Sequence, residues 1–280
     1  MRPVISIIDA VILGVVEGLT EFLPVSSTGH LILAAAWLGL YRVPDAKAGI
    51  DAFGIVIQSG ALLAVAGIYA PQIRLILQGL CKQDPAGRRL LLLLMSGFLP
   101  AAVIGLSAGS WIKTALFGIG PVAGALAAGG LCMIFIERGS RRKARTAPCR
   151  KEKQISDMTV RSALVIGGAQ CLAMWPGASR SMVTIMAARL LGFQPKAAAE
   201  FSFLLALPTL GGATMYEIYH QGPMLLHASG PVGLIVGLSV SCLVAWIAVK
   251  GFLSYLNRRG MEVFGWYRIA LAGVLMFSFF

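Results

Sequence analysis

Long apolar segments decide what this 280-residue chain can fold into. A helix that crosses a bilayer needs roughly 20 mostly apolar residues, and several segments have that length. Hydrophobic residues make up 57% of the sequence and charged residues 13%, with a mean hydropathy of +0.79, which excludes a soluble globular domain. We therefore predict an all-α polytopic membrane protein, a single integral membrane domain over 1–280. Six transmembrane helices are expected at about 51–70, 90–110, 115–136, 201–220, 230–250 and 264–280.

Two further apolar regions, 4–40 and 162–194, are interrupted near their middles. Proline and glycine make the interruptions: Pro24 and Gly29 in the first region, Pro176 and Gly177 in the second. The resulting halves are mostly too short to span a bilayer, and they cover about 4–22, 27–40, 162–174 and 179–193. Non-helical backbone at membrane depth is tolerated where it is buried in protein or lines a cavity. Two re-entrant helical hairpins are therefore predicted.

Basic residues are concentrated in one interval, and this orients the predicted helices. Nine of the 24 lysines and arginines are Arg138, Arg141, Arg142, Lys143, Arg145, Arg150, Lys151, Lys153 and Arg161. The net charge of +12 does not indicate a nucleic-acid partner, because no aromatic residues are interleaved with these charges. Basic loops face the cytoplasm, which places 71–89, 137–161 and 250–262 inside. The first hairpin then enters from outside and the second from inside, which predicts an inverted-topology repeat with halves 1–136 and 162–280.

The stretch from Glu17 to His30, EGLTEFLPVSSTGH, places ionisable groups where an apolar membrane segment has none. Such groups are costly at membrane depth and mark sites of binding or reaction. Glu17 and Glu21 are four residues apart, so on a helix they share one face and need a counter-charge. A divalent cation, Mg²⁺ or Ca²⁺, would supply that charge through oxygen ligands. Alternatively, one glutamate is protonated and the other pairs with Arg180.

Three hydroxyl residues, Ser26, Ser27 and Thr28, follow Pro24 and begin the second half-helix. One such hydroxyl is an ordinary helix cap, but the N–H groups of a helix N-terminus also bind anions. His30 lies one turn after Ser27, and a serine with a base in reach is the arrangement of a nucleophile. The segment therefore predicts an anion site with a reactive hydroxyl.

The stretch from Trp175 to Thr184, WPGASRSMVT, places a cation at the predicted turn of the second hairpin. Arg180 stands there between Ser179 and Ser181. A guanidinium flanked by hydroxyls and helix-terminal N–H groups can hold a phosphate through two parallel hydrogen bonds, and Thr184 adds a hydroxyl one turn on. The two polar stretches together predict the halves of one phosphate-handling site.

These motifs, with VIQSGALLAV and EFSFLLALP, resemble the undecaprenyl-pyrophosphate phosphatase family, the bacitracin-resistance proteins of bacteria, over nearly the whole chain. The family usually has glycine after the SRS triplet, where this chain has Met182. The resemblance implies a multi-pass protein of the bacterial plasma (inner) membrane with an inverted repeat and a site that opens toward the outer, periplasmic side. It implies hydrolysis of a polyprenyl diphosphate to the monophosphate, dependent on a divalent cation, which recycles the carrier lipid for peptidoglycan synthesis and confers bacitracin resistance. By position, the functional residues are Glu17, Glu21, Ser27, His30 and Arg180.

A mechanism follows from both lines of argument. Glu17 and Glu21 hold the cation, Arg180 and the neighbouring hydroxyls bind the phosphates, and Ser27 attacks the terminal phosphorus with His30 or Glu21 as base. His30 as nucleophile and a metal-activated water are the alternatives. A function of another class also fits broken helices at mid-membrane: a flippase that transports a polyprenyl phosphate and releases no phosphate.

Small residues at helical spacing predict close helix contacts, at Gly120 with Gly124 and at Gly233 with Gly237. Such a contact forms either inside the chain or between two copies in a homodimer. The expected partners are therefore the lipid substrate, membrane lipids and, under the second of these alternatives, another copy of the chain.

Overall fold

The computed structural model describes residues 3–43, 46–81, 84–116, 118–146, 152–256 and 258–279, and the regular secondary structure within them is helical. Four of the described helices contain segments that are long and apolar enough to cross a membrane. They are α3 (Lys47–Ile68), α5 (Pro85–Leu116), α6 (Ile119–Thr146) and α9 (Pro195–Leu256). The chain is thus an all-α membrane protein, as predicted. The count of six spans and the inverted repeat stay predictions.

The chain forms two units, each assembled from separate stretches of sequence. Unit 1 comprises Met1–Leu23, Ser27–Ile68 and Ala206–Gly251. Unit 2 comprises Pro24–Ser26, Tyr69–Leu205 and Phe252–Phe280. The three-residue turn Pro24–Ser26 therefore belongs to unit 2, although the helices on either side of it belong to unit 1.

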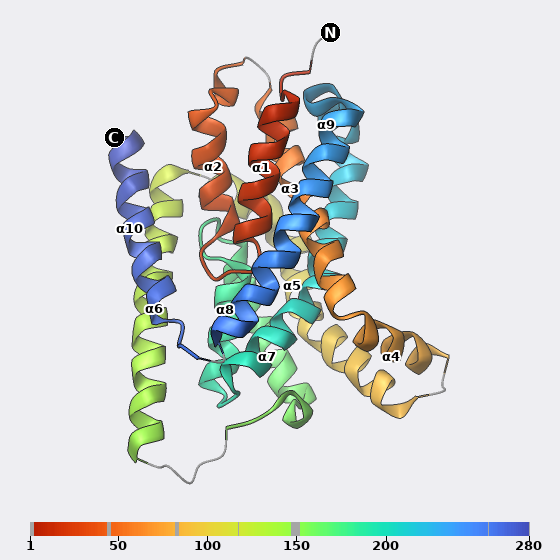
Figure 1. Cartoon of the computed structure of the whole chain (residues 1–280), viewed down its shortest axis with the longest axis vertical. Helices are drawn as coiled ribbons and strands as arrows, with labels where there is room; N and C mark the ends of the chain where they lie inside the picture. The colour runs from red at the N-terminus through yellow and green to blue at the C-terminus, as the bar shows by residue number, and fades with distance from the viewer. Residues whose placement is uncertain are drawn as a thin grey trace. The chain divides into compact units, whose positions relative to one another are not determined.

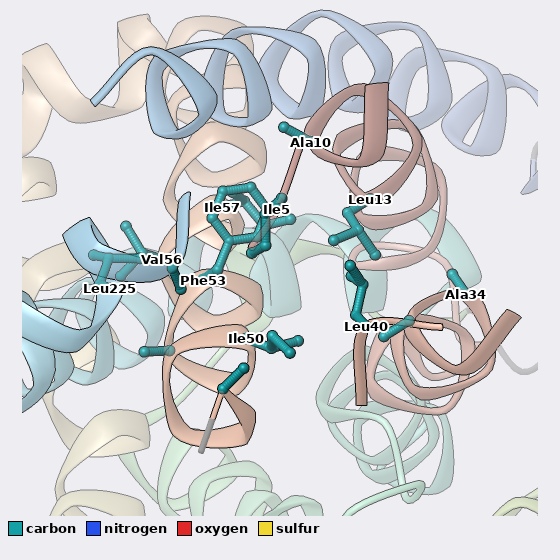
Figure 2. Packing of buried hydrophobic residues seen from close by; sticks show 14 residues of the cluster. Ile5, Ala10, Leu13, Ala34, Leu40, Ile50, Phe53, Val56, Ile57 and Leu225 are labelled. Atoms are coloured by element: carbon teal, nitrogen blue, oxygen red, sulfur yellow. The ribbon is translucent and has the colours of Figure 1, made fainter. Parts of the chain in front are cut away.

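Unit 1 contains α1 (Ile7–Thr20), α2 (Ser27–Trp37), α3 and the middle of α9 (Figure 1). Helix α1 begins with a capping box, in which the Ser6 side chain accepts from Asp9 N–H and the Asp9 carboxylate accepts from Ser6 N–H. The core of the unit is an apolar cluster from all four helices, shown in Figure 2, with Phe53 and Ile57 of α3 fully buried.

Glycines bring α1 directly onto the backbone of α9 within unit 1. A Cβ at Gly14 would lie 2.8 Å from Gly237 O, and one at Gly18 would lie 2.6 Å from Ser241 O. Only glycine therefore allows this approach, which fixes the face of α1 that carries Glu17. The predicted close contact at Gly237 is confirmed as a packing contact inside the chain.

Helix α9 is 62 residues long because two helices follow each other across Gly230. Gly230 has φ +63°, and Pro231 follows it, so the backbone leaves the helical conformation there and the chain turns back on itself (Figure 1). The two expected spans at 201–220 and 230–250 correspond to the helical segments on either side of this break.

Unit 2 contains α4 (Ala70–Leu80), α5, α6, α7 (Val160–Gln170), α8 (Arg180–Leu190) and α10 (Glu262–Phe279). Helices α6 and α10 run side by side (Figure 1), with Gly130 and Gly265 at their contact. Helix α7 packs against α5 where a Cβ at Gly167 would overlap Gly97 O.

Two expected loops are largely helical. The interval 71–89 forms most of α4 and the start of α5, because Gly79 and Gly87 let the two helices touch through their backbones. The interval 137–161 begins as part of α6, which continues to Thr146 and carries ion pairs with Glu262. Runs of arginine and lysine are compatible with a helix, so charge alone did not indicate where the helices end.

The glycine pair Gly120 and Gly124 differs from the pair that includes Gly237. A Cβ at either position would meet no described atom within 4 Å, so neither glycine serves a close contact with the part of the chain that the structure describes. A homodimer through this face stays a prediction.

Candidate functional site

Two helices of unit 1 form the first predicted hairpin, and α1 and α2 pack against each other there. The helical conformation continues to Glu21, whose N–H donates to Glu17 O at 2.9 Å. Glu17 and Glu21 are therefore one helical turn apart, as their spacing predicts. Both are buried: Glu17 is 0% exposed and Glu21 is 7% exposed.

The clearest functional geometry in unit 1 is the pair of Ser27 and Glu21. The Ser27 hydroxyl donates to Glu21 Oε2 at 2.7 Å, and both residues are buried. A serine has one hydroxyl proton, so this proton is directed at the carboxylate. Thr28 and His30, on the same helix α2, are both half-buried.

The turn between α1 and α2 has a backbone conformation that is unusual for serine. Ser26 has φ +73° and is 2% exposed, and it directly precedes the first residue of α2. A non-glycine residue in the left-handed region costs free energy and persists where its surroundings hold it there.

The second predicted hairpin lies in unit 2 and has the same order of parts. Helix α7 continues as η3 (Cys171–Met174), and α8 begins at Arg180. Gly177 at the turn has φ +95°, and a Cβ there would lie 2.5 Å from Val122 O, so only glycine fits. Ser179 has φ +68°, and its side chain caps α8 by accepting from Met182 N–H. A serine of positive φ thus precedes the second helix of each hairpin.

The start of α8 is a connected group of polar side chains. Arg180 Nη1 donates to Ser202 O at 3.0 Å, and the hydroxyls of Ser179 and Ser181 lie 3.1 Å apart. The Thr184 hydroxyl lies 2.6 Å from the Ser202 hydroxyl and 2.8 Å from Arg180 O. Ser181 and Thr184 are 0% exposed, whereas Ser179 and Arg180 are half-buried.

The structure therefore places the predicted residues in two groups. Unit 1 holds Glu17, Glu21, Ser27, Thr28 and His30; unit 2 holds Ser26, Ser179, Arg180, Ser181 and Thr184. That both groups serve one diphosphate stays a prediction from the sequence.

Sequence reasoning missed two residues and misplaced a third. Ser202 supports Arg180 and Thr184, and its signal was a hydroxyl inside the apolar run EFSFLLALP. Arg268 is 0% exposed on α10, and its signal was an arginine within the apolar C-terminal segment. The place of Glu217 near the end of the expected span 201–220 predicts a solvated side chain, but the structure leaves it only 8% exposed.

The donor set suits a divalent cation bound together with its substrate. Mg²⁺ is commonly bound by one or two carboxylates plus substrate phosphates and water, rather than by an all-protein cage. Glu17 and Glu21 supply two such carboxylates. Among the described residues, no group of three or more His, Cys, Asp or Glu side chains forms a complete metal cage. Two carboxylates one helical turn apart are nevertheless a donor set that fits a divalent cation with further oxygen ligands.

Comparison with known proteins gives one consistent result. The family model for the bacitracin resistance protein BacA matches residues 10–274. The undecaprenyl-diphosphatase of Sorangium cellulosum is 51% identical over 269 residues, which cover 96% of this chain and 85% of that protein. The undecaprenyl-diphosphatase of Acidovorax ebreus is 44% identical over 270 residues, covering 96% of this chain and 94% of that protein. The chain therefore belongs to the family of bacitracin resistance protein BacA.

Proposed function

We propose that this chain is an undecaprenyl-diphosphatase of the bacterial inner membrane that releases phosphate from the lipid diphosphate and so supports bacitracin resistance. Relatives bearing that name match it over nearly its whole length. The observation that carries the chemistry is the buried hydrogen bond from the Ser27 hydroxyl to Glu21 Oε2 at 2.7 Å. A hydroxyl whose proton already points at a carboxylate is prepared for attack.

In the proposed first step, the Ser27 oxygen attacks the terminal phosphorus. The bond from that phosphorus to the bridging oxygen breaks, and undecaprenyl phosphate leaves with the bond's electrons. The Ser27 proton passes to Glu21. Water then attacks the phosphorus of the phosphoserine while Glu21 returns its proton to the serine oxygen, which restores the hydroxyl and the carboxylate and releases inorganic phosphate. His30, one turn after Ser27 on α2, would stabilise charge near the serine.

Arg180 would bind phosphate oxygens, because a guanidinium already held by Ser202 O presents a planar, oriented donor. Ser179 and Ser181 would contribute hydroxyls beside it, while Ser26 and Thr28 flank the nucleophile. Thr184 would act chiefly by orienting the start of α8, since it is buried against Ser202. Glu17 and Glu21 would hold a divalent cation, Mg²⁺ or Ca²⁺, which neutralises phosphate charge when bound. The site would open to the periplasmic side.

Phosphate release from undecaprenyl diphosphate by purified protein in detergent tests the proposal. We expect release with Mg²⁺ or Ca²⁺ and none with EDTA. Ser27→Ala should lower kcat by at least about 100-fold, because it removes both the nucleophile and the bond to Glu21. Ser59→Ala, which loses only a hydroxyl bonded to its own helix at Val56 O, is the matched control. Folded wild-type protein that binds the lipid and releases no phosphate would contradict the function.

A further inference from the structure

Arg268 is the largest fully buried side chain among the described residues, and it lies outside the groups that the sequence singled out. Its Nη2 donates to three carbonyl oxygens: Gly177 O at 2.9 Å, Ala178 O at 3.1 Å and Ala125 O at 3.1 Å. Its Nη1 donates to Pro24 O at 3.4 Å. The ion pairs recorded for the described residues do not include Arg268. Within the described residues the guanidinium is thus held by backbone carbonyls rather than by a carboxylate, an arrangement that is costly to bury.

Three of the four carbonyls come from turns of unit 2 that precede the reactive residues, and the fourth, Ala125 O, lies on α6. Pro24 lies in the turn Pro24–Ser26, directly before the helix that begins with Ser27. Gly177 and Ala178 form the turn directly before Ser179 and Arg180. A planar guanidinium has five N–H donors in a fixed fork, so it can tie these turns to α6 at once. No other side chain has that donor geometry.

Three glycines allow the guanidinium to reach this position. A Cβ at Gly130 would lie 2.6 Å from Gly265 O, and a Cβ at Gly265 would lie 2.8 Å from Gly130 O, so α6 and α10 touch through their backbones. A Cβ at Gly129 would overlap Arg268 Nη2 and would lie 2.7 Å from Met182 Cε. The guanidinium therefore occupies the space that a side chain at position 129 would fill.

We propose that Arg268 is a positioning residue for phosphate release, which rests on the proposed function. It holds the turns at Pro24 and at Gly177–Ala178 in fixed geometry. Through them it sets the left-handed conformations of Ser26 and Ser179 at the starts of α2 and α8. It contacts backbone rather than substrate, so it affects how well the bound substrate reacts more than how tightly the substrate binds.

Kinetics of Arg268 variants give the first test. A displacement of about 1 Å at a reactive group can cost on the order of 100-fold in rate, so Arg268→Ala should lower kcat by about that factor and change KM little. Arg268→Lys keeps the charge but has no planar fork, and should stay at least about 10-fold below wild type. Guanidinium ion added to Arg268→Ala should restore part of kcat and leave wild type unchanged. Full activity of Arg268→Lys, or a loss that lies wholly in KM, would overturn the role.

A second variant displaces the guanidinium from its carbonyl partners without changing Arg268 itself. Gly129→Ala places a methyl group where the guanidinium lies, so it should lower kcat as Arg268→Ala does. Gly124→Ala, on the same helix α6, meets no described atom within 4 Å and should retain wild-type kcat. Equal activity of the two glycine variants would overturn the proposal even where Arg268→Ala fails to fold.

Hydrogen exchange separates this inference from the proposed function. In Arg268→Ala, peptides that cover 24–26 and 177–179 should exchange faster together, although about 150 residues separate them in the sequence, while a peptide from α3 should not change. Unchanged exchange in both peptides would overturn the positioning role whatever the enzyme does. Wild type that shows the expected protection yet releases no phosphate would instead overturn the proposed function and leave the bridging by Arg268 intact.

Discussion

At the scale of single residues, Arg180 is both held by a backbone carbonyl and proposed to bind phosphate. Arg180→Lys keeps the charge but loses the fork that would let the proposed phosphate be bound while one nitrogen bonds Ser202 O. We expect kcat/KM to fall by about 10- to 150-fold, which corresponds to the loss of a charged hydrogen bond of about 1.5–3 kcal/mol. Arg138→Lys is the control, because Arg138 is exposed and pairs with Glu262. A variant with wild-type kcat/KM would remove Arg180 from the proposed site.

The contact between Thr184 and Ser202 is a second residue-scale feature, and it is fully buried. Thr184→Val should destabilise the protein by about 1–3 kcal/mol, because the buried Ser202 hydroxyl loses its partner. The double variant with Ser202→Ala should cost less than the sum of the two single changes. Thermal unfolding in detergent measures this, and additive losses would show that the hydroxyls do not interact.

At the scale of elements, the contact of α1 with α9 sets the position of the carboxylates. Gly18→Ala should destabilise the protein by about 1–3 kcal/mol, since the new methyl group meets Ser241 O and Val244 Cβ, and a backbone atom cannot turn aside. Gly222→Ala, also helical and with no described atom within 4 Å of its Cβ, should be neutral or stabilising by up to about 1 kcal/mol. Unfolding midpoints that fall equally in both variants would show that helix flexibility, rather than the contact, governs the result.

The same scale shows which elements a sequence can predict. Pro24 and Pro176 mark the two hairpin turns, and the helices begin at Ser27 and Arg180, where the hydroxyl clusters predict them to begin. The helical hairpin over 71–89 was missed, because its interhelix contact depends on glycines that carry no hydrophobic pattern.

The site residues likewise divide into those that the sequence could indicate and those that it could not. Ser27 and Glu21 belong to neighbouring halves of one hairpin, and the sequence named Glu21 and His30 as alternative bases for Ser27 without choosing between them; the hydrogen bond to Glu21 comes from the structure. Arg268 bonds carbonyls from three distant segments, and backbone acceptors have no sequence signature. Only the cost of an arginine in an apolar segment could have drawn attention to it.

At the scale of the whole molecule, the distribution of basic residues predicts which face lies in the cytoplasm. In a variant whose five cysteines are replaced, Ser156→Cys should react with a membrane-impermeant maleimide in inside-out vesicles and not in spheroplasts. Arg42→Cys, between α2 and α3, should show the opposite pattern, and both positions are exposed. Labelling of Ser156→Cys in intact spheroplasts would reverse the orientation.

The bond between Arg268 and Pro24 O joins positions that are 244 residues apart, so it can form only late in the synthesis of the chain. At roughly 5–20 residues per second, the ribosome needs on the order of 10–50 s to extend the chain from one position to the other. During that interval the first hairpin is already made while its arginine does not yet exist. A nascent chain that stops short of α10 therefore contains Ser27 and Glu21 but lacks the residue that fixes the turn between their helices. Under the proposed role of Arg268, synthesis of the last helix is the step that completes the site.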